Sequence, residues 1–298
     1  MKKKRKEKQD NIGYVYLIPA FFGLTFLTYG PLLAMMIISL FNWTGLSSPR
    51  FIGFGNYVRL FTTDPFFMDS IRVTIVFSLL AVIGGMIYSL TIALLMNRKM
   101  PARGFFRSVF YLPYVLPAAS VYIGWSWLYE TNFGVFNYLL KQIGINNVMF
   151  LNDSRYAVPS LAVIAVWLSG NYIVIFLAGL QNVPRMYYEA AEIDGASSFR
   201  RFIHITIPCM TPIIFYNLLM SLITNMQVII PALALTQGGP SNSTMFISFL
   251  MYHYAFRINQ VGYGSAISFV FFVIIAIFTS ILFLTSKGWI FYEGGDKK

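Results

Sequence analysis

Long apolar runs separated by short charged segments dominate the hydrophobic pattern of this chain. A helix that crosses a bilayer needs about 20 mostly apolar residues, and six stretches reach this length without any Asp, Glu, Lys or Arg. A seventh apolar piece, residues 244–256, is too short to cross and is predicted to lie at the membrane interface. The pattern therefore predicts an all-α, polytopic membrane protein with six transmembrane helices at 14–41, 73–96, 108–129, 156–180, 205–235 and 262–286.

The charges between these stretches predict the orientation of the chain. If the N-terminus is cytoplasmic, the inner segments hold 16 of the 22 Lys and Arg residues, and the outer segments hold 6. Cytoplasmic loops of membrane proteins carry an excess of basic residues. We therefore expect both termini in the cytoplasm, with a basic tail over 1–13, a membrane domain over 14–286 and a second tail over 287–298.

Composition excludes several other classes of protein. The chain is 57% hydrophobic and 11% charged, whereas soluble domains carry roughly 25% charged residues, so a soluble bundle of buried helices is a poor alternative. The net charge of +11 is then explained by orientation in a bilayer rather than by nucleic-acid binding. The basic N-terminus resembles a signal peptide, but the uncharged run over 11–49 far exceeds a signal core of about 7–15 residues. We interpret it as the first span.

Residues 184–208 form a compact charged segment, here called the polar segment, between the fourth and fifth apolar stretches. Pro184 suits the first turn of a helix, because its missing N–H would be unpaired there. Gly195 suits a left-handed C-cap. Ser197 or Ser198 can cap a second short helix that continues into the fifth stretch. The sequence predicts two short helices in place of a plain loop.

The polar segment also places small residues where another backbone can approach. Ala191 and Gly195 stand four residues apart on one predicted helix face, which favours docking of a partner, with an ordinary cytoplasmic loop as the alternative. The spacing Glu-Ala-Ala, three residues, Gly, nine residues, Ile-Thr-Ile-Pro resembles the EAA loop of binding-protein-dependent ABC importer permeases, although Ile207 replaces the usual Leu. In that family the loop is a coupling helix that enters a cleft of a cytoplasmic ATPase. The resemblance implies coupling roles for Glu189, Ala190, Ala191, Asp194, Gly195 and Pro208.

Further motifs resemble carbohydrate-importing permeases of the maltose and glycerol-phosphate type. They are YLIPAFFGLTFLTYGPLL, FIGFGNYVRLFTTDPFF, RGFFRSVFYLPYVLP, LTQGGPSNST and YGSAISFVFFVI, and they cover nearly the whole chain. The resemblance implies the type I ABC importer permease fold in a bacterial plasma (inner) membrane, with a carbohydrate, in particular an oligosaccharide, as cargo. It also implies a heterodimer with a second permease, two ATPase subunits that hold ATP and Mg, and an extracytoplasmic solute-binding protein. No cofactor is expected in this chain.

Polar residues within the apolar stretches are candidates for the substrate path, because a polyol needs hydrogen-bond partners and aromatic faces rather than charges. Ser221 and Asn225 are one helical turn apart and share a face, and by the resemblance they match sugar-contacting positions. Tyr114, Asn171 and Tyr172 are further candidates. The alternative is that such residues only join helices through hydrogen bonds.

Other function classes fit the sequence less well. The chain contains no G-x-x-x-x-G-K-[ST] phosphate loop, and we predict neither catalytic nor metal-binding residues. An ion-gradient-driven secondary carrier is the main alternative, but such carriers place ionisable residues within spans, and all eleven carboxylates lie outside the apolar stretches. A non-transporting scaffold is disfavoured by the polar residues within the spans. The sequence thus predicts a transport subunit rather than an enzyme.

Overall fold

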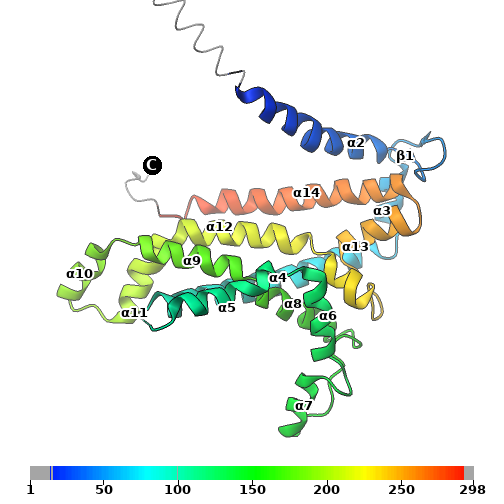
Figure 1. Ribbon diagram of the computed structural model, residues 1–298. Helices are drawn as coiled ribbons and strands as arrows, with labels where there is room; N and C mark the ends of the chain where they lie inside the picture. Colours follow the sequence, from blue (N-terminus) through cyan, green and yellow to red (C-terminus); the bar gives the residue numbers. More distant parts are fainter. Residues whose placement is uncertain (1–13, 15, 99, 292–298) are drawn as a thin grey trace, which may run out of the picture. The chain divides into compact units, whose positions relative to one another are not determined.

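The computed structural model describes residues 14, 16–98 and 100–291, so the expected tail over 1–13 and most of the tail over 287–298 lie outside the described residues. The chain divides into two compact units, 1–64 with 251–272 and 65–250 with 273–298. Within the described residues the regular structure is helical apart from one two-stranded sheet. The predicted all-α class is therefore confirmed (Figure 1).

The first unit joins the N-terminal helix to segments from near the other end of the chain. Asn56 is buried and donates hydrogen bonds to the carbonyls of Ser39 (2.8 Å) and Phe41 (3.0 Å). The Arg59 guanidinium lies 4.1 Å from the ring centroid of Tyr263, which links two segments distant in sequence. The elements are the π-helical turn η1 (Leu24–Tyr29), α2 (Gly30–Ile38), the antiparallel strands β1 (Phe41–Asn42) and β2 (Arg50–Phe51), α3 (Gly55–Thr62), the π-helical turn η4 (His253–Arg257) and the first part of α14 (Val261–Ser286).

The second unit is organised around α4 (Phe67–Asn97), a helix of 31 residues. Helices α8, α9 and α12 pack along α4, and α5 packs against α9. Apolar side chains such as Ala93, Ile173 and Met210 form the core between them. The other elements are α5 (Arg103–Val115), α6 (Ala118–Leu128), α7 (Val135–Gln142), α8 (Ala157–Trp167), α9 (Gly170–Asn182), α10 (Arg185–Ile193), α11 (Ser198–Arg201), the π-helical turn η2 (Phe202–Thr206), α12 (Ile207–Met226), the π-helical turn η3 (Ala232–Thr236) and α13 (Ile247–Tyr252), with the rest of α14.

The structure modifies the predicted list of spans. Four helical runs, 16–38, 67–97, 198–226 and 261–286, are long and apolar enough to cross a membrane, and the pair α8 and α9, bent by 47°, can form a fifth. The predicted third span instead divides into α5 and α6 at Leu116 and Pro117. Proline lacks an N–H and disfavours a helical conformation in the preceding residue, and Leu116 is indeed extended. The count of six spans therefore remains a prediction.

The short apolar piece at 244–256 also differs from the expectation of an interfacial position. Residues 244–250 are all buried. Phe246 packs on Phe77 of α4 with ring centroids 5.0 Å apart, and the Ile247 N–H donates to the Thr74 hydroxyl at 3.0 Å. Residues 244–250 are part of the protein core. An apolar run of this length can be buried against a neighbouring helix as well as at the membrane interface.

Candidate functional site

The polar segment folds as two capped helices, as the sequence predicts. Pro184 is the N-cap of α10, one residue before the first turn in which the sequence predicts it, and Gly195 follows that helix with φ of 69°, in the left-handed region. The Gly195 N–H donates to the Glu192 carbonyl (3.1 Å) and the Ala196 N–H to the Ala191 carbonyl (2.8 Å). This pair of bonds is a Schellman motif, which satisfies carbonyls at the end of a helix.

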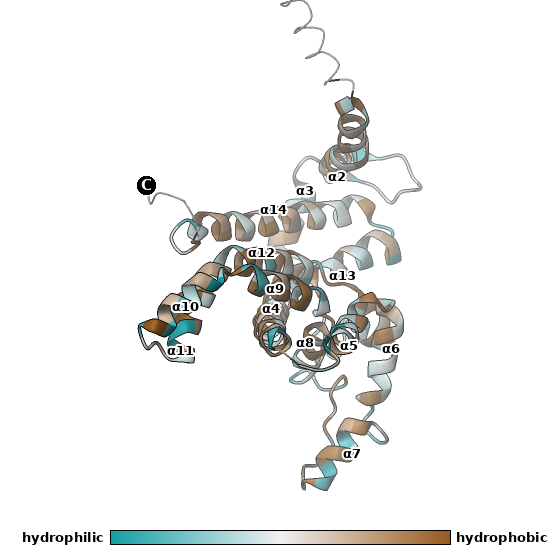
Figure 2. Cartoon of the chain, turned by 60° about the vertical axis from the view of Figure 1, so that its left-hand side comes forward, coloured by the Kyte–Doolittle hydropathy of each residue, from teal (hydrophilic) through white to brown (hydrophobic). Residues whose placement is uncertain are grey.

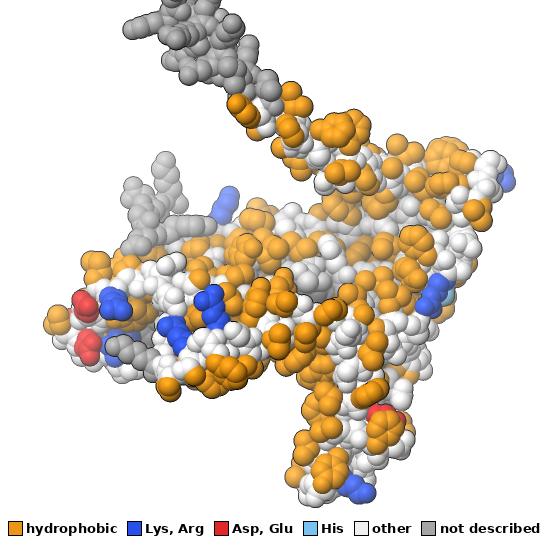
Figure 3. Space-filling model, in the orientation of Figure 1, with side chains coloured by type: hydrophobic (Ala, Val, Ile, Leu, Met, Phe, Trp, Pro, Cys, Tyr) orange, Lys and Arg blue, Asp and Glu red, His pale blue; other side chains and the backbone are white. Residues whose placement is uncertain are grey.

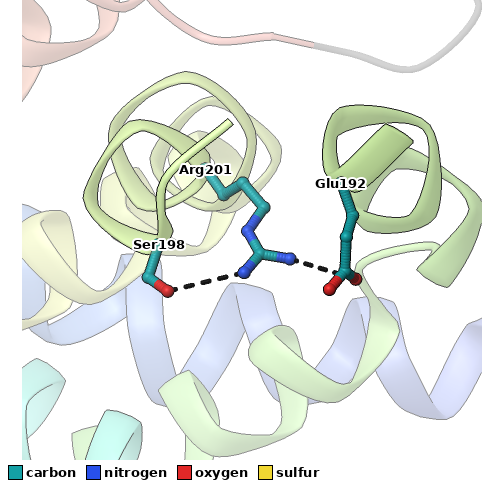
Figure 4. A network of polar contacts seen from close by, with 3 residues as sticks. All are labelled: Glu192, Ser198 and Arg201. Atoms are coloured by element: carbon teal, nitrogen blue, oxygen red, sulfur yellow. Dashed lines mark hydrogen bonds and ion pairs between the residues drawn. The ribbon is translucent and has the colours of Figure 1, made fainter. Parts of the chain in front are cut away.

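The second short helix is tied both to the first and to α12. Ser197 is the N-cap of α11, and its hydroxyl accepts from the Arg200 N–H at 3.4 Å. The Arg201 guanidinium lies 3.4 Å from a Glu192 carboxylate oxygen and 3.4 Å from the Ser198 hydroxyl (Figure 4). A continuous helical run of 29 residues then extends from Ser198 to Met226, so α11, η2 and α12 follow one another without a break.

The surface of the polar segment combines charge with exposed apolar side chains. Charged residues of both signs gather around α10 and α11 (Figure 3). Both helices also carry hydrophilic residues, coloured teal in Figure 2. Yet Ile193 is 87% exposed and Phe199 is 71% exposed, and a Cβ added at Gly195 would meet nothing within 4 Å. Ile193 and Phe199 therefore present large apolar side chains on the exposed surface of this segment.

Four of the six predicted coupling residues are exposed on the polar segment. Ala191 is half-buried, and Pro208 is half-buried in the first turn of α12. The other four, Glu189, Ala190, Asp194 and Gly195, are exposed. Sequence reasoning missed Ile193 and Phe199, although two large apolar residues flanking Gly195 in a charged segment were a usable signal.

A cavity of about 720 Å³ opens in the second unit, with walls from α5, α9 and α12 and from the segment after α12. Among the described residues its lining holds no Asp, Glu, Lys, Arg or His, and consists of apolar side chains, tyrosines, and hydroxyl and amide side chains. The structure brings together in it all five residues predicted for the substrate path, Tyr114, Asn171, Tyr172, Ser221 and Asn225.

Hydrogen bonds orient the polar groups of the cavity. The Asn225 amide donates to the Ser221 carbonyl (2.8 Å) and to its hydroxyl (3.2 Å). The Tyr172 side chain is mostly buried and neighbours the side chains of Thr224, Asn171 and Ser221. Such a cluster of hydroxyl and amide groups can both donate to and accept from a polyhydroxylated ligand.

The shape of the cavity depends on a break between α8 and α9. Ser169 lies at this break, and the Ser89 hydroxyl from α4 contacts its carbonyl (3.2 Å) and its hydroxyl (3.0 Å). Gly170 starts α9 against α5 so closely that an added Cβ would lie 2.5 Å from the Phe110 carbonyl oxygen. Only glycine permits this approach, which places Asn171 and Tyr172 beside α5.

Several cavity residues were not singled out from the sequence. Tyr111, Tyr122, Tyr216 and Thr224 all line the cavity, and the spacing of Ser221 and Thr224 by three residues was the available signal for the last of them. Asn217 has a different place: it is fully buried and its amide donates to the Tyr172 carbonyl at 3.4 Å. It joins α12 to α9 and is absent from the cavity lining.

Comparisons with known proteins agree with these features. A sequence model of the family described as binding-protein-dependent transport system inner membrane component matches residues 81–290. The probable ABC transporter permease protein YesP of Bacillus subtilis is 35% identical over 302 residues, which cover 100% of this chain and 97% of that protein. The trehalose/maltose transport system permease protein MalF of Thermococcus litoralis is 31% identical, over 93% of this chain and 94% of that protein. These relatives confirm the resemblance to ABC importer permeases that the motifs indicate.

A solved structure shows the same fold. It is described as a bacterial ABC transporter involved in the import of the acidic polysaccharide alginate, and one of its chains superposes with a TM-score of 0.80 at 22% identity. The superposition covers 96% of this chain and 99% of that chain. The ABC importer permease fold expected from the sequence is thereby confirmed.

Proposed function

Because the chain belongs to the family of binding-protein-dependent transport system inner membrane components, we propose that it is the permease subunit of an ATP-driven importer of a carbohydrate, best an oligosaccharide. Its apolar helices make it a multi-pass membrane protein. The observation that carries the choice of cargo is the uncharged cavity with its tyrosine rings, amides and hydroxyls. A sugar offers hydroxyl groups to the polar side chains and C–H faces to the rings, without any charge to neutralise.

The polar segment is proposed as the contact with a cytoplasmic ATPase. In this proposal Glu189, Ala190, Ala191, Asp194, Gly195 and Pro208 form or support the docking surface. The exposed tips of Ile193 and Phe199 support it, because apolar side chains at a solvent-exposed end mark a protein interaction site. Both termini and this segment then face the cytoplasm.

The remaining partners follow from the same proposal. A second, related permease completes a heterodimer, two ATPase subunits bind ATP and Mg, and an extracytoplasmic solute-binding protein delivers the sugar. Closure of the ATPase dimer moves the polar segment, and the helices around the cavity switch its access from one side of the membrane to the other. No step of this cycle requires a charged residue in the lining of the cavity.

Reconstitution tests the proposal. The chain, its proposed partner permease and the ATPase are placed in sealed vesicles with the binding protein outside and ATP inside, and radiolabelled oligosaccharide uptake is measured. We expect uptake only when ATP and the ATPase are present. Uptake by the permeases alone, driven by a proton or sodium gradient, would establish the secondary carrier instead.

A further inference from the structure

An arm between α6 and α8, residues 129–156, carries an apolar outer face that neither the cavity nor the polar segment uses. The arm is ordered by its own contacts. Asn137 of α7 is 2% exposed, its amide donates to the carbonyls of Val148 (2.9 Å) and Thr131 (3.2 Å), and its oxygen accepts from the Val148 N–H (2.8 Å). The buried Asn137 amide thus joins the start of the arm, at Thr131, to its later part, at Val148.

Aromatic rings fix the arm to the end of α6. Phe136 stacks on Trp125 with ring centroids 5.7 Å apart and also contacts Tyr129 at 5.3 Å. At the entry turn, backbone N–H groups of Phe133 and Asn132 donate to the Glu130 carboxylate and hold the pKa of that carboxyl below its usual value. The arm therefore holds its shape without help from a partner protein.

The outer face of the arm is apolar and almost uncharged. Phe133 is 75% exposed and Ile143 is 71% exposed, and Val135, Tyr138 and Leu139 are exposed between them. Lys141 is the only charged residue between positions 131 and 152, whereas soluble domains carry charges at roughly one residue in four. A contiguous exposed apolar patch of this kind marks an interaction surface.

The neighbouring helix favours lipid as the partner of this face. On α6, Ile123 and Trp127 lie one turn apart, and Trp127 is 72% exposed, so the apolar surface continues from a segment expected within the bilayer onto the arm. Trp and Tyr are the residues enriched at membrane–water interfaces, and a Lys at the edge can extend its charge to water. We propose that α7 lies in the lipid headgroup layer where α6 ends, with the face formed by Val135, Tyr138 and Leu139 in contact with acyl chains.

Spin labelling tests this placement independently of the cargo or the ATPase. In the full chain with Cys209→Ala, which removes its single cysteine, a nitroxide is attached at Leu139→Cys or, as the matched control, at the exposed Asn146→Cys of the same arm. In phosphatidylcholine and phosphatidylglycerol vesicles, we expect the label at position 139 to be accessible to oxygen and shielded from a water-soluble nickel chelate. The label at position 139 should lie about 5–10 Å into the boundary between headgroups and acyl chains, while the chelate reaches position 146.

Two results would overturn the lipid assignment. One is equal access of the chelate to positions 139 and 146, which would show that the outer face lies in water. The other is shielding of position 139 that appears only after the solute-binding protein is added, which would make that protein the partner. Tyr138→Cys, on the same exposed face, repeats the measurement if the label at 139 disturbs the arm.

Discussion

The polar segment and the cavity lie in the same unit of the molecule but are built in opposite ways. The polar segment is stabilised by contacts between residues close in sequence, such as the Ser197 cap and the Glu192–Arg201 pair, and its end is exposed. The cavity is formed by side chains from α5, α9 and α12, with helix contacts such as Ser89 to Ser169 that join residues 80 positions apart.

This difference explains how the polar segment can keep its shape while the cavity changes. A segment held by local capping depends less on how the membrane helices pack, because the Ser197 cap and the Glu192–Arg201 pair join residues within the segment itself. A cavity whose walls come from several helices changes its outline with any shift of their packing. We therefore expect substitutions in the first to affect coupling, and substitutions in the second to affect cargo binding or stability.

The largest effect is expected from Gly195→Asp. The left-handed backbone at Gly195 costs a side-chain residue about 1–2 kcal/mol, and the new carboxylate would occupy the docking face, so ATP-dependent uptake should fall to background while the protein remains in the membrane. Gly53→Asp is the matched control, because Gly53 also has positive φ and open space around its Cβ position. Normal uptake by Gly195→Asp would refute the coupling role.

Gly170→Ala should damage the packing that shapes the cavity. Its new methyl group would meet the Phe110 carbonyl oxygen at 2.5 Å, and overpacking of this kind costs about 1–3 kcal/mol. We expect a lower thermal unfolding temperature in detergent and reduced uptake. Gly124→Ala, in a helix with nothing within 4 Å of its Cβ position, should leave both unchanged; equal losses in the two variants would contradict the close approach of α5 and α9.

Asn225→Ala separates sugar binding from helix joining. Loss of one neutral hydrogen bond is worth about 0.5–1.5 kcal/mol, so the sugar concentration for half-maximal uptake should rise roughly two- to tenfold with ATPase assembly unchanged. Asn217→Ala is the comparison, since the buried Asn217 contacts the Tyr172 carbonyl and should lower the unfolding temperature instead. Unchanged uptake kinetics in Asn225→Ala would assign Asn225 a purely structural role.

The smallest effect is expected from Glu192→Gln. The ion pair with Arg201 is at the surface, with the Glu192 side chain 73% exposed, and such pairs contribute about 0–1 kcal/mol. We expect a slightly lower unfolding temperature at low salt that matches the parent protein at high salt. Glu189→Gln on the same helix serves as the control, and a large, salt-independent loss for Glu192→Gln would show that the pair is more than a surface contact.

The sequence predicted the locally determined parts of the molecule well. Pro184, Gly195 and Ser197 carry conformational preferences of their own, so the two capped helices could be derived without any tertiary contact. The five cavity residues also proved to line one space. Polar side chains within apolar helices find hydrogen-bond partners mainly in one another, so they gather on the same side. Their roles in binding sugar remain a prediction.

Tertiary packing explains what the sequence could not predict. Proline is tolerated within membrane helices, so the pattern alone did not show that Pro117 separates α5 from α6 while Pro113 and Pro212 lie inside helices. Hydrophobic length likewise did not reveal that residues 244–250 pack on α4. The contact of Gly170 with α5 depends on residues 60 positions apart, for which a single sequence gives no local signal.

The unbroken helical run from Ser198 to Met226 has a mechanical consequence. With a rise of about 1.5 Å per residue, Ser221 lies about 35 Å along the axis from Ser198. A tilt of only about 10° at the Ser198 end of this helix moves the Ser221 end sideways by about 6 Å, roughly the width of one sugar ring. A small tilt at the Ser198 end can therefore be amplified, by length alone, into a displacement of several ångströms of the α12 residues that line the cavity.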